Sequence, residues 1–328
     1  MTTILHLDPD SEIEILEKTS DILKKSGVAI VPTDTVYGLI CDGESEIAKK
    51  NIYAIKKRPE SKPLIAFVKD IQQAENLAFI PDSSLPFILK RWPGRNTFIF
   101  RARIESKYVV TSDGAIALRI PAHSFINRLC DAFPFLASTS ANISSAGSAC
   151  CVEQIDFSII NKVSIVIDGG KTSDRESAIW DMTQDVPKLI RGRILFVCSG
   201  NSCRSPMAQA ILKSFVAPSI DVISAGIEPN FFQCIPGETI EALREDGITM
   251  QNFVPRNLTP GMVESSDLIF AMEEKHREAV LRLFPEADDR TFVLDVQDPA
   301  GGDIFKYRQI RDIIKQRINK YVLKRIKA

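Results

Sequence analysis

The sequence predicts an α/β protein built from two domains. At 328 residues the chain is longer than one small domain usually requires. Short apolar, β-prone segments alternate with amphipathic segments, a pattern typical of sheets covered by helices. Hydrophobic residues make up 45% and charged residues 25% of the chain, as in ordinary globular proteins. We therefore expect two packed α/β domains, residues 1–192 and 193–328.

Charge and cysteine usage argue against several classes of protein. Residues 1–192 carry 23 basic and 24 acidic side chains, and residues 193–328 carry 18 of each. Neither half has the positive excess expected for strong binding to nucleic acid. Seven cysteines without framework spacing argue against a disulfide scaffold, and three scattered histidines argue against a zinc site. With no apolar run long enough for a membrane and no leading signal segment, we expect a cytoplasmic protein.

The first half begins with a predicted amphipathic helix over residues 11–26, which Gly27 ends. The apolar segment 28–31 predicts a buried strand that runs into the hydroxyl-rich turn 32–39. Hydroxyl and backbone groups at a strand end suit a small polar ligand. A simple capped turn has the same composition, so both interpretations stay open.

Basic and hydroxyl residues recur farther along this half. Lys56, Arg58 and Lys62 surround a proline-broken loop that follows a short predicted helix. Cations at a helix end can satisfy its free carbonyl groups, or they can clamp a polyphosphate. Arg119 then follows at a predicted strand end, and residues 138–144 form a second loop of hydroxyl and amide side chains.

Six short motifs follow one another within residues 10–192. They are Pro-Thr-Asp-Thr-Val-Tyr-Gly-Leu from residue 32, Lys-Lys-Arg-Pro-x-x-Lys-Pro-Leu from 56, Trp-Pro-Gly from 92, Leu-Arg-Ile-Pro from 118, Thr-Ser-Ala-Asn-x-Ser from 139 and Leu-Ile-Arg-Gly from 189. Together they resemble the YrdC family, the threonylcarbamoyl-AMP synthases. The resemblance implies a twisted α/β sandwich with a concave, positively lined cavity. It also implies that L-threonine, bicarbonate and ATP give threonylcarbamoyl-AMP and pyrophosphate, a product used by other, tRNA-modifying proteins.

The same resemblance implies a set of binding residues. Those expected to contact ATP or threonine are Thr35, Lys56, Arg58, Arg119, Ser140, Asn142, Ser144, Ser177 and Arg191. The cations Lys56, Arg58 and Arg119 are expected at phosphate or carboxylate groups. Charge builds up on phosphate oxygens when a threonine carbamate attacks the α-phosphorus, so Mg²⁺ is expected to accompany ATP.

Two segments depart from the family pattern. Arg95 and Asn96 stand where Pro-Leu is usual after Trp-Pro-Gly. Ala178 and Trp180 replace the Thr and Val of a late Ser-Thr-Ile-Val-Asp segment. These changes keep a second hypothesis open, in which the first half is a nucleotide- or RNA-binding module that regulates or localises the second half. Threonine-dependent release of pyrophosphate from ATP distinguishes the two hypotheses.

The join between the halves contains no flexible linker. The last motif leads directly into the apolar segment 194–197, a predicted buried strand. A turn-prone run follows and ends at Ser205-Pro206, a good helix start because serine caps and proline fits the first helical position. Strand, tight loop and helix N-terminus in this order form a cradle for an anion.

Cys198 opens this loop and Arg204 closes it, with five residues between them. A thiol at a helix N-terminus beside a guanidinium is expected to be a thiolate. The planar guanidinium suits two phosphate oxygens. Ser205 can donate a hydrogen bond to the sulfur and improve it as a leaving group. A buried cysteine with an unrelated arginine is the alternative, but it leaves the rest of the pattern to coincidence.

The run Val-Cys-Ser-Gly-Asn-Ser-Cys-Arg-Ser-Pro-Met from residue 197 closely resembles the signature loop of low-molecular-weight protein tyrosine phosphatases and their arginine-phosphatase relatives. The resemblance implies a doubly wound parallel sheet with the site at the carboxyl edge of its strands. It implies hydrolysis of a phosphorylated protein through a phosphocysteine, without a cofactor. Asp298 is then the general acid in preference to Asp295. The residues expected to support the loop are Asn201, Ser202, Cys203 and Ser224.

Substrate choice stays open at this point. Tyrosine-specific members commonly carry an aliphatic residue before the second loop cysteine and an aromatic residue after Asp-Pro, whereas the arginine phosphatases carry threonine at the first place. Ser202 and Ala300 stand there in this chain, which favours phosphoarginine. Serine has less bulk than threonine to exclude phosphotyrosine, so both substrates remain candidates. Cys203 either packs or captures an oxidised Cys198 as a disulfide.

The remaining elements of the second half follow from apolar periodicity. The predicted helices cover residues 206–216, 239–246 and 303–326, and the predicted strands cover 222–226 and 266–272.

Overall fold

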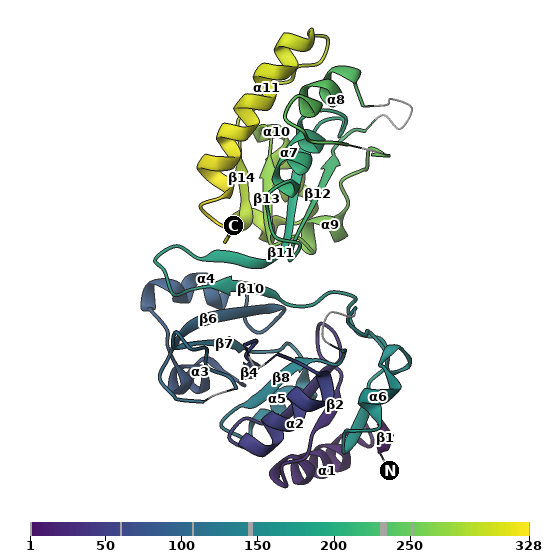
Figure 1. Cartoon of the computed structure of the whole chain (residues 1–328), viewed down its shortest axis with the longest axis vertical. Helices are drawn as coiled ribbons and strands as arrows, with labels where there is room; N and C mark the ends of the chain where they lie inside the picture. Colours follow the sequence, from purple (N-terminus) through teal and green to yellow (C-terminus); the bar gives the residue numbers. More distant parts are fainter. Residues whose placement is uncertain are drawn as a thin grey trace. The chain divides into compact units, whose positions relative to one another are not determined.

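The computed structural model describes residues 2–59, 61–106, 108–143, 147–229, 235–250 and 252–327. The chain divides into two compact units, Met1–Pro187 and Lys188–Ala328 (Figure 1). Both units combine a β-sheet with helices, so the α/β class predicted from the sequence is confirmed.

The first unit is organised around a mixed sheet. Its strands are β1 (Thr3–His6), β2 (Ala29–Val31), β3 (Gly38–Asp42), β4 (Ile65–Phe67), β5 (Ala78–Phe79), β6 (Asn96–Ala102), β7 (Ala115–Arg119), β8 (Leu136–Ser140), β9 (Ile165–Asp168) and β10 (Ala178–Asp181). They pair in the order β1-β9-β2-β3-β8-β4-β7-β6-β10, with β5 beside β6. The sheet contains both parallel pairs, such as β4 with β7, and antiparallel pairs, such as β3 with β8.

Helices surround this sheet. They are α1 (Glu12–Lys24), α2 (Glu46–Lys56), α3 (Ile71–Leu77), α4 (Leu85–Leu89), α5 (Ser124–Cys130) and α6 (Phe157–Ile160). The apolar stripe of α1 packs with α5 into a core cluster that includes Leu23, Phe125 and Ile165. Ser45 begins α2 by accepting a hydrogen bond from the Ala48 N–H, as an N-cap serine does.

The second unit is a doubly wound parallel sheet. Its strands are β11 (Lys188–Cys198), β12 (Ile220–Gly226), β13 (Leu268–Ala271) and β14 (Thr291–Val293), paired in the order β12-β11-β13-β14. Its helices are α7 (Arg204–Lys213), α8 (Gly237–Arg244), α9 (Pro260–Glu264), α10 (Glu274–Leu283) and α11 (Ile304–Arg317). Successive strands β12 and β13 lie on opposite sides of β11. The carboxyl end of β11 is therefore a switch point, where such sheets bind ligands.

Helices cover this sheet in Figure 1. Leu195 and Val197 of β11 share a core cluster with Val263 of α9 and Val280 of α10. Helix α7 packs against β11 and β12, and α11 packs against α7 and α8.

The end of the chain differs from the single helix predicted over residues 303–326. Helix α11 ends at Arg317 and a π-helical segment, Ile318–Val322, follows. In that segment the N–H of Leu323 donates to the carbonyl of Ile318, five residues back. The wider turn accompanies the burial of Ile318, Val322 and Ile326, and Ile326 bridges to Leu189 of β11.

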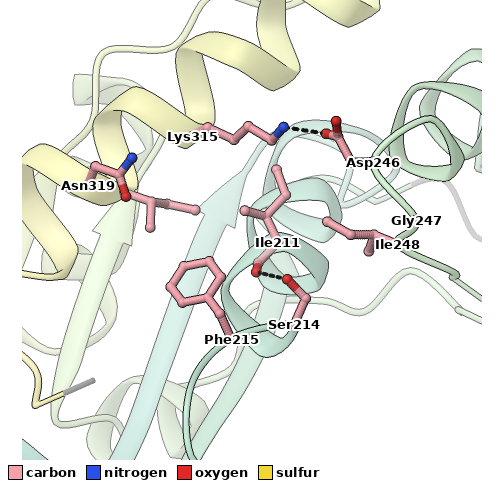
Figure 2. Close-up of a pocket in the computed structure, with 9 residues that line it drawn as sticks. Ile211, Ser214, Phe215, Asp246, Gly247, Ile248, Lys315 and Asn319 are labelled. Atoms are coloured by element: carbon pink, nitrogen blue, oxygen red, sulfur yellow. Dashed lines mark hydrogen bonds and ion pairs between the residues drawn. The ribbon is translucent and has the colours of Figure 1, made fainter.

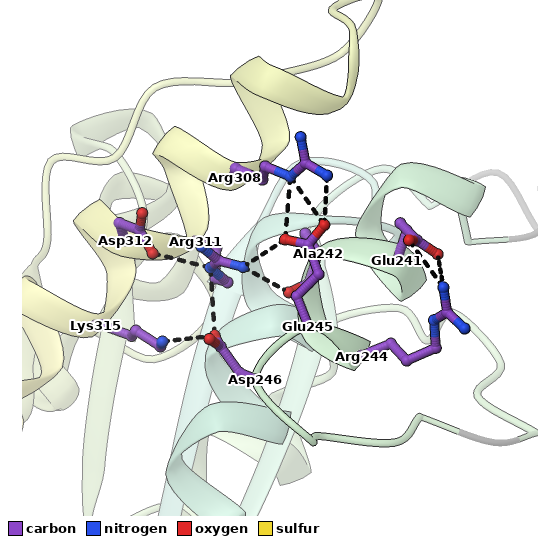
Figure 3. A network of polar contacts seen from close by, with 9 residues as sticks. All are labelled: Glu241, Ala242, Arg244, Glu245, Asp246, Arg308, Arg311, Asp312 and Lys315. Atoms are coloured by element: carbon purple, nitrogen blue, oxygen red, sulfur yellow. Dashed lines mark hydrogen bonds and ion pairs between the residues drawn. The ribbon is translucent and has the colours of Figure 1, made fainter.

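An ionic network fastens α11 to the end of α8 (Figure 3). Arg308 and Arg311 both donate to the carboxylate of Glu245, and Lys315 lies 2.5 Å from a carboxylate oxygen of Asp246. Single exposed pairs contribute little to stability, but a network with shared partners contributes more than its isolated pairs.

A pocket of about 580 Å³ lies between α7 and α11 (Figure 2). It is lined by Ile211, Ser214, Phe215, Asp246, Gly247, Ile248, Lys315, Ile318 and Asn319. It sits at the carboxyl end of α7, whereas Arg204 is the first residue of that helix, and it contains none of the candidate site residues.

Among the described residues, no helix combines the length and apolar character needed to span a bilayer.

Candidate active sites

The loop after β11 is the centre of the second unit. Cys198 is the last residue of β11, and α7 starts six residues later at Arg204. The Cys198 side chain is buried, and its sulfur lies 2.9 Å from the hydroxyl of Ser205. The loop packs directly against Gly226 of β12. Only glycine fits there, because a Cβ would lie 2.6 Å from the carbonyl oxygen of Ser199.

Asn201 sets the shape of the loop from inside. Its φ of +49° is left-handed, a conformation that asparagine tolerates. The side-chain amide is fully buried and donates to the hydroxyls of Ser205 and Ser224, both at 2.9 Å. Its oxygen accepts the backbone N–H of Arg256 at 2.9 Å. Both polar atoms of the side chain therefore make hydrogen bonds that fix the loop.

Arg204 is almost fully buried and its guanidinium is shared among four acceptors. Nη1 donates to Glu273 at 2.5 Å and to the carbonyl of Val296 at 3.1 Å. Nη2 donates to a carboxylate oxygen of Asp298 and to the hydroxyl of Ser199 at 3.3 Å. The arginine therefore joins the loop to the segment that carries the Asp-Pro pair.

Of the two acidic residues in that segment, Asp298 reaches the loop. Its second carboxylate oxygen accepts the N–H of Ala300 at 3.1 Å. The side chain of Asp295 is 85% exposed and lies 3.6 Å from Arg317.

Glu273 and His276 belong to this site although neither was among the residues predicted from the sequence. Glu273 caps α10, and its N–H donates to Nδ1 of His276 at 3.0 Å in a reciprocal capping box. Nε2 of His276 lies 2.9 Å from the Ser199 hydroxyl. Burial, followed by the charge of Arg204, lowers the pKa of His276 to about 4. The signal for both residues was a Met-Glu-x-x-His run directly after a buried strand.

Glu273 stays ionised beside Arg204. Burial pushes the pKa of Glu273 upward, but hydrogen bonds and positive charge from Arg204 and Lys275 outweigh it, so the pKa is lowered. Ser202 and Cys203 complete the loop. Cys203 is buried, and its burial raises the pKa of the thiol to about 12, which keeps it protonated.

In the first unit, Arg119 joins two of the predicted contact segments. It is buried at the end of β7 and donates from Nη1 to the Thr35 hydroxyl at 2.9 Å. Nη2 lies 2.5 Å from Asp34, and Nε donates to the carbonyl of Gly94 at 3.0 Å. The hydroxyl turn after β2 and the Trp-Pro-Gly segment therefore meet at one guanidinium.

Lys56 gathers the other segments. Its ammonium is buried and donates to the carbonyl of Ser140 and, at 2.9 Å, to Oδ1 of Asn142. Burial, and then the charge of Arg58, lower the pKa of Lys56 to about 7 against the opposite effect of Glu176. An ammonium with this pKa loses part of its charge at neutral pH.

The remaining predicted residues are more scattered. Arg58 donates at 2.8 Å to the carbonyls of Lys62 and Pro63 in its own loop. The buried Ser177 hydroxyl lies 2.9 Å from that of Thr97. Arg191 lies in β11 and so belongs to the second unit. Ser144 falls outside the described residues.

Within the part of the chain that the structure describes, no group of three or more His, Cys, Asp or Glu side chains is arranged to hold a metal ion.

Comparison with known proteins identifies both halves. Residues 21–192 match the model of the Sua5/YciO/YrdC family, described as "Telomere recombination". Residues 193–328 match the model described as "Low molecular weight phosphotyrosine protein phosphatase". A threonylcarbamoyl-AMP synthase of Vibrio vulnificus is 31% identical over 159 residues, which are 47% of this chain and 86% of that protein.

The second half has a comparable relative. A protein-arginine-phosphatase of Bacillus subtilis is 37% identical over 135 residues, covering 38% of this chain and 89% of that protein. The crystal structure of Escherichia coli YciO covers 58% of this chain and 94% of its own, with a TM-score of 0.53 and 22% identity, and so supports the fold of the first half. The chain therefore belongs to two families, joining a Sua5/YciO/YrdC domain to a low-molecular-weight phosphotyrosine protein phosphatase domain.

Proposed function

We propose that the chain is a bifunctional enzyme, with a threonylcarbamoyl-AMP synthase in residues 1–192 and a protein phosphatase in residues 193–328. The main support for the phosphatase activity is the arrangement of Cys198, Arg204 and Asp298 at the carboxyl end of β11. The proposed synthase activity is supported by the two buried cations, Lys56 and Arg119. They donate hydrogen bonds to the hydroxyl and amide segments that the family also carries.

The phosphatase reaction starts with the Cys198 thiolate. The sulfur attacks phosphorus in line with the leaving group, a phosphocysteine forms, and Asp298 protonates the departing atom. Asp298 then takes a proton from water, whose oxygen attacks the phosphocysteine and releases inorganic phosphate and the thiolate. Arg204 and the loop amides stabilise the charge on the phosphoryl oxygens. Ser205, 2.9 Å from the sulfur, stabilises the thiolate as it leaves.

The contact between Asp298 and Arg204 supports a route by which the acid meets its substrate. The carboxylate binds Nη2 of Arg204, which the phosphoryl group requires. An incoming phosphoryl group takes that position and frees the carboxylate at the mouth of the loop. Asp298 is then next to the leaving group that it protonates.

Phosphoarginine is the substrate that the chain supports best. The 37% identity to a protein-arginine-phosphatase supports it, as does Ser202, the small hydroxylated residue before the second loop cysteine. Phosphotyrosine is the second candidate because the matching family model bears that description. Rates on phosphoarginine and phosphotyrosine versions of one peptide, measured on one preparation, decide between them. A kcat/KM that favours phosphotyrosine contradicts the proposal.

The synthase reaction needs no covalent nucleophile from the protein. A threonine carbamate, formed from L-threonine and bicarbonate, attacks the α-phosphorus of ATP and pyrophosphate leaves. Lys56, Arg58 and Arg119 bind phosphate or carboxylate oxygens, while Thr35, Ser140 and Asn142 hold threonine and nucleotide. Ser144, Ser177 and Arg191 are proposed as lesser contacts. Mg²⁺ would enter with ATP, held chiefly by the phosphates, because Mg²⁺ in such sites is bound through few carboxylates.

The second candidate for this half is a nucleotide- or RNA-binding module, favoured by Arg95, Asn96 and Ala178, which depart from the family pattern. Pyrophosphate release from ATP distinguishes it. A synthase releases pyrophosphate only when both threonine and bicarbonate are present. Nucleotide binding without threonine-dependent turnover supports the module and contradicts the synthase.

Each activity provides the control for the other in the full chain. Cys198→Ser should abolish phosphatase turnover and leave pyrophosphate release unchanged, whereas Lys56→Met should lower pyrophosphate release and leave the phosphatase unchanged. Normal phosphatase turnover by Cys198→Ser contradicts the assignment of the nucleophile.

A further inference from the structure

Ser199, the second residue of the phosphatase loop, lies between two hydrogen-bond donors. Its Oγ is 2.9 Å from Nε2 of His276 and 3.3 Å from Nη2 of Arg204. The residue is partly exposed and directly follows the proposed nucleophile Cys198. None of the roles described above uses its hydroxyl group.

The capping box determines which nitrogen of His276 carries the proton. The N–H of Glu273 donates to Nδ1, so that nitrogen accepts and has no hydrogen. A neutral imidazole then carries its hydrogen on Nε2, and this hydrogen is directed at Ser199. Burial of the ring and the charge of Arg204, which lower the pKa of His276 to about 4, keep it neutral.

The hydroxyl oxygen of Ser199 accepts two hydrogen bonds. A guanidinium only donates, and Nε2 of His276 donates as well, so both lone-pair positions of the hydroxyl oxygen are occupied. The hydroxyl hydrogen is left for a third partner. Among the described residues, no acceptor for it is present within hydrogen-bond distance.

We propose that Ser199 is a further substrate-binding residue, which donates its hydroxyl hydrogen to the phosphoryl oxygen bound by Nη2 of Arg204, and that His276 is its positioning residue. This assignment rests on the proposed phosphatase function. The physical basis of this assignment is the orientation of the Ser199 hydroxyl group. With both lone pairs engaged, the hydroxyl presents its hydrogen to an anion, and a rotated hydroxyl that presented oxygen would repel the same anion.

Binding of inorganic phosphate to the full chain tests the assignment, measured by calorimetry and as competitive inhibition. Ser199→Ala should weaken phosphate binding on the order of 10-fold or more, since a hydrogen bond to a charged group is lost. Ser199→Thr keeps the hydroxyl and should stay within about threefold of the wild type. Ser219→Ala, an exposed serine just before β12, is the matched control and should not change binding. Unchanged phosphate affinity in Ser199→Ala overturns the proposal.

A double-mutant cycle tests the positioning role of His276. His276→Leu removes the Nε2 donor and should weaken phosphate binding when Ser199 is present, but not further in the Ser199→Ala background. His276→Gln, which retains an N–H donor, should restore part of the loss. Equal weakening in both backgrounds indicates a structural role and overturns the positioning assignment, while the Ser199 variants still decide the donor.

The same measurements separate this inference from the proposed function. If the wild type binds phosphate but hydrolyses neither phosphoarginine nor p-nitrophenyl phosphate, the phosphatase function is contradicted and the Ser199 variants still decide the donor. If the wild type is active and Ser199→Ala binds phosphate normally, only the Ser199 assignment is wrong. A wild type that does not bind phosphate contradicts both.

Discussion

The indole Nε1 of Trp180 donates a hydrogen bond to Oδ1 of Asn96 over 2.9 Å. The backbone carbonyl of Asn96 accepts a second indole N–H, from Trp92 at 2.7 Å. Trp180 and Asn96 lie on the parallel neighbours β10 and β6, and each departs from the pattern of its family. The two departures are therefore a matched pair, because the larger side chain brings a buried N–H and the asparagine supplies its acceptor.

Because of this hydrogen bond, we expect substitutions at Asn96 and Trp180 to have coupled effects on the stability of the first unit. Asn96→Leu leaves the indole N–H without its acceptor and should destabilise the first unit by about 1–3 kcal/mol. Trp180→Phe in the same chain removes that unpaired group, so the double variant should lose less than the sum of the two single variants. Urea unfolding of the four chains measures the coupling, and strict additivity contradicts the pairing.

Asp298→Asn is expected to separate catalysis from phosphate binding. The amide cannot protonate a leaving group, so kcat should fall about 100-fold or more. It also carries no charge to compete for Arg204, so inorganic phosphate should inhibit more strongly than in the wild type. Steady-state rates with phosphate as inhibitor measure both effects.

Asp295→Asn is the matched control for that variant. Its side chain is 85% exposed and outside the loop, so both quantities should stay unchanged. Loss of kcat in Asp295→Asn, with normal turnover in Asp298→Asn, contradicts the choice between the two residues.

His276 is expected to make stability depend on pH. Its pKa is about 4 in the fold and about 6.5 in an unfolded chain, so between these values the unfolded state binds more protons. Stability should be fully present above pH 6.5 and fall as pH decreases towards 4, by roughly 3 kcal/mol over the whole range. Burial, followed by the charges of Arg204 and Lys275, lowers this pKa, while Glu273 and Asp298 raise it.

The measurement compares the wild type with His276→Gln between pH 7 and 5 by urea unfolding. The glutamine does not titrate, so the difference in slope reports the histidine. Parallel curves for the two chains contradict a neutral His276.

Lys56 is expected to take up a proton when ATP binds. Its pKa of about 7 leaves the ammonium largely neutral at pH 8, and the phosphates of a bound nucleotide raise that pKa. Uptake should approach one proton near pH 8 and vanish near pH 6, where the lysine is already charged. Calorimetry in buffers of different ionisation enthalpy counts the protons.

Lys56→Met should abolish the uptake, whereas Lys50→Met, an exposed lysine on the same helix, should leave it unchanged. Equal uptake by the wild type and Lys56→Met would show that another group titrates.

Features that depend on neighbouring residues in the sequence could be predicted, whereas contacts between distant segments could not. The strand, turn and helix around Cys198 are encoded within a dozen residues, and the predicted doubly wound sheet is confirmed. The predicted cap at Ser205 was wrong, because α7 begins at Arg204 with Cys203 at its N-cap and without a side-chain cap hydrogen bond. Glu273 and His276 were missed because they lie about 70 residues downstream, and only the folded sheet brings α10 to the loop. The contact between Asn96 and Trp180 likewise depends on strand pairing across 84 positions. The π-helical end was missed because helical periodicity does not reveal which turn widens.

The continuity of β11 bears on how the two halves can be separated. Leu189 belongs to the first family's match, which ends at 192, yet its backbone hydrogen-bonds to Arg325 and Lys327 near the other end of the chain. A boundary placed after residue 192 would divide β11 in its middle. The second domain would then lose the backbone hydrogen bonds that Leu189 makes with Arg325 and Lys327. A stand-alone second domain should therefore start no later than Lys188, where β11 begins.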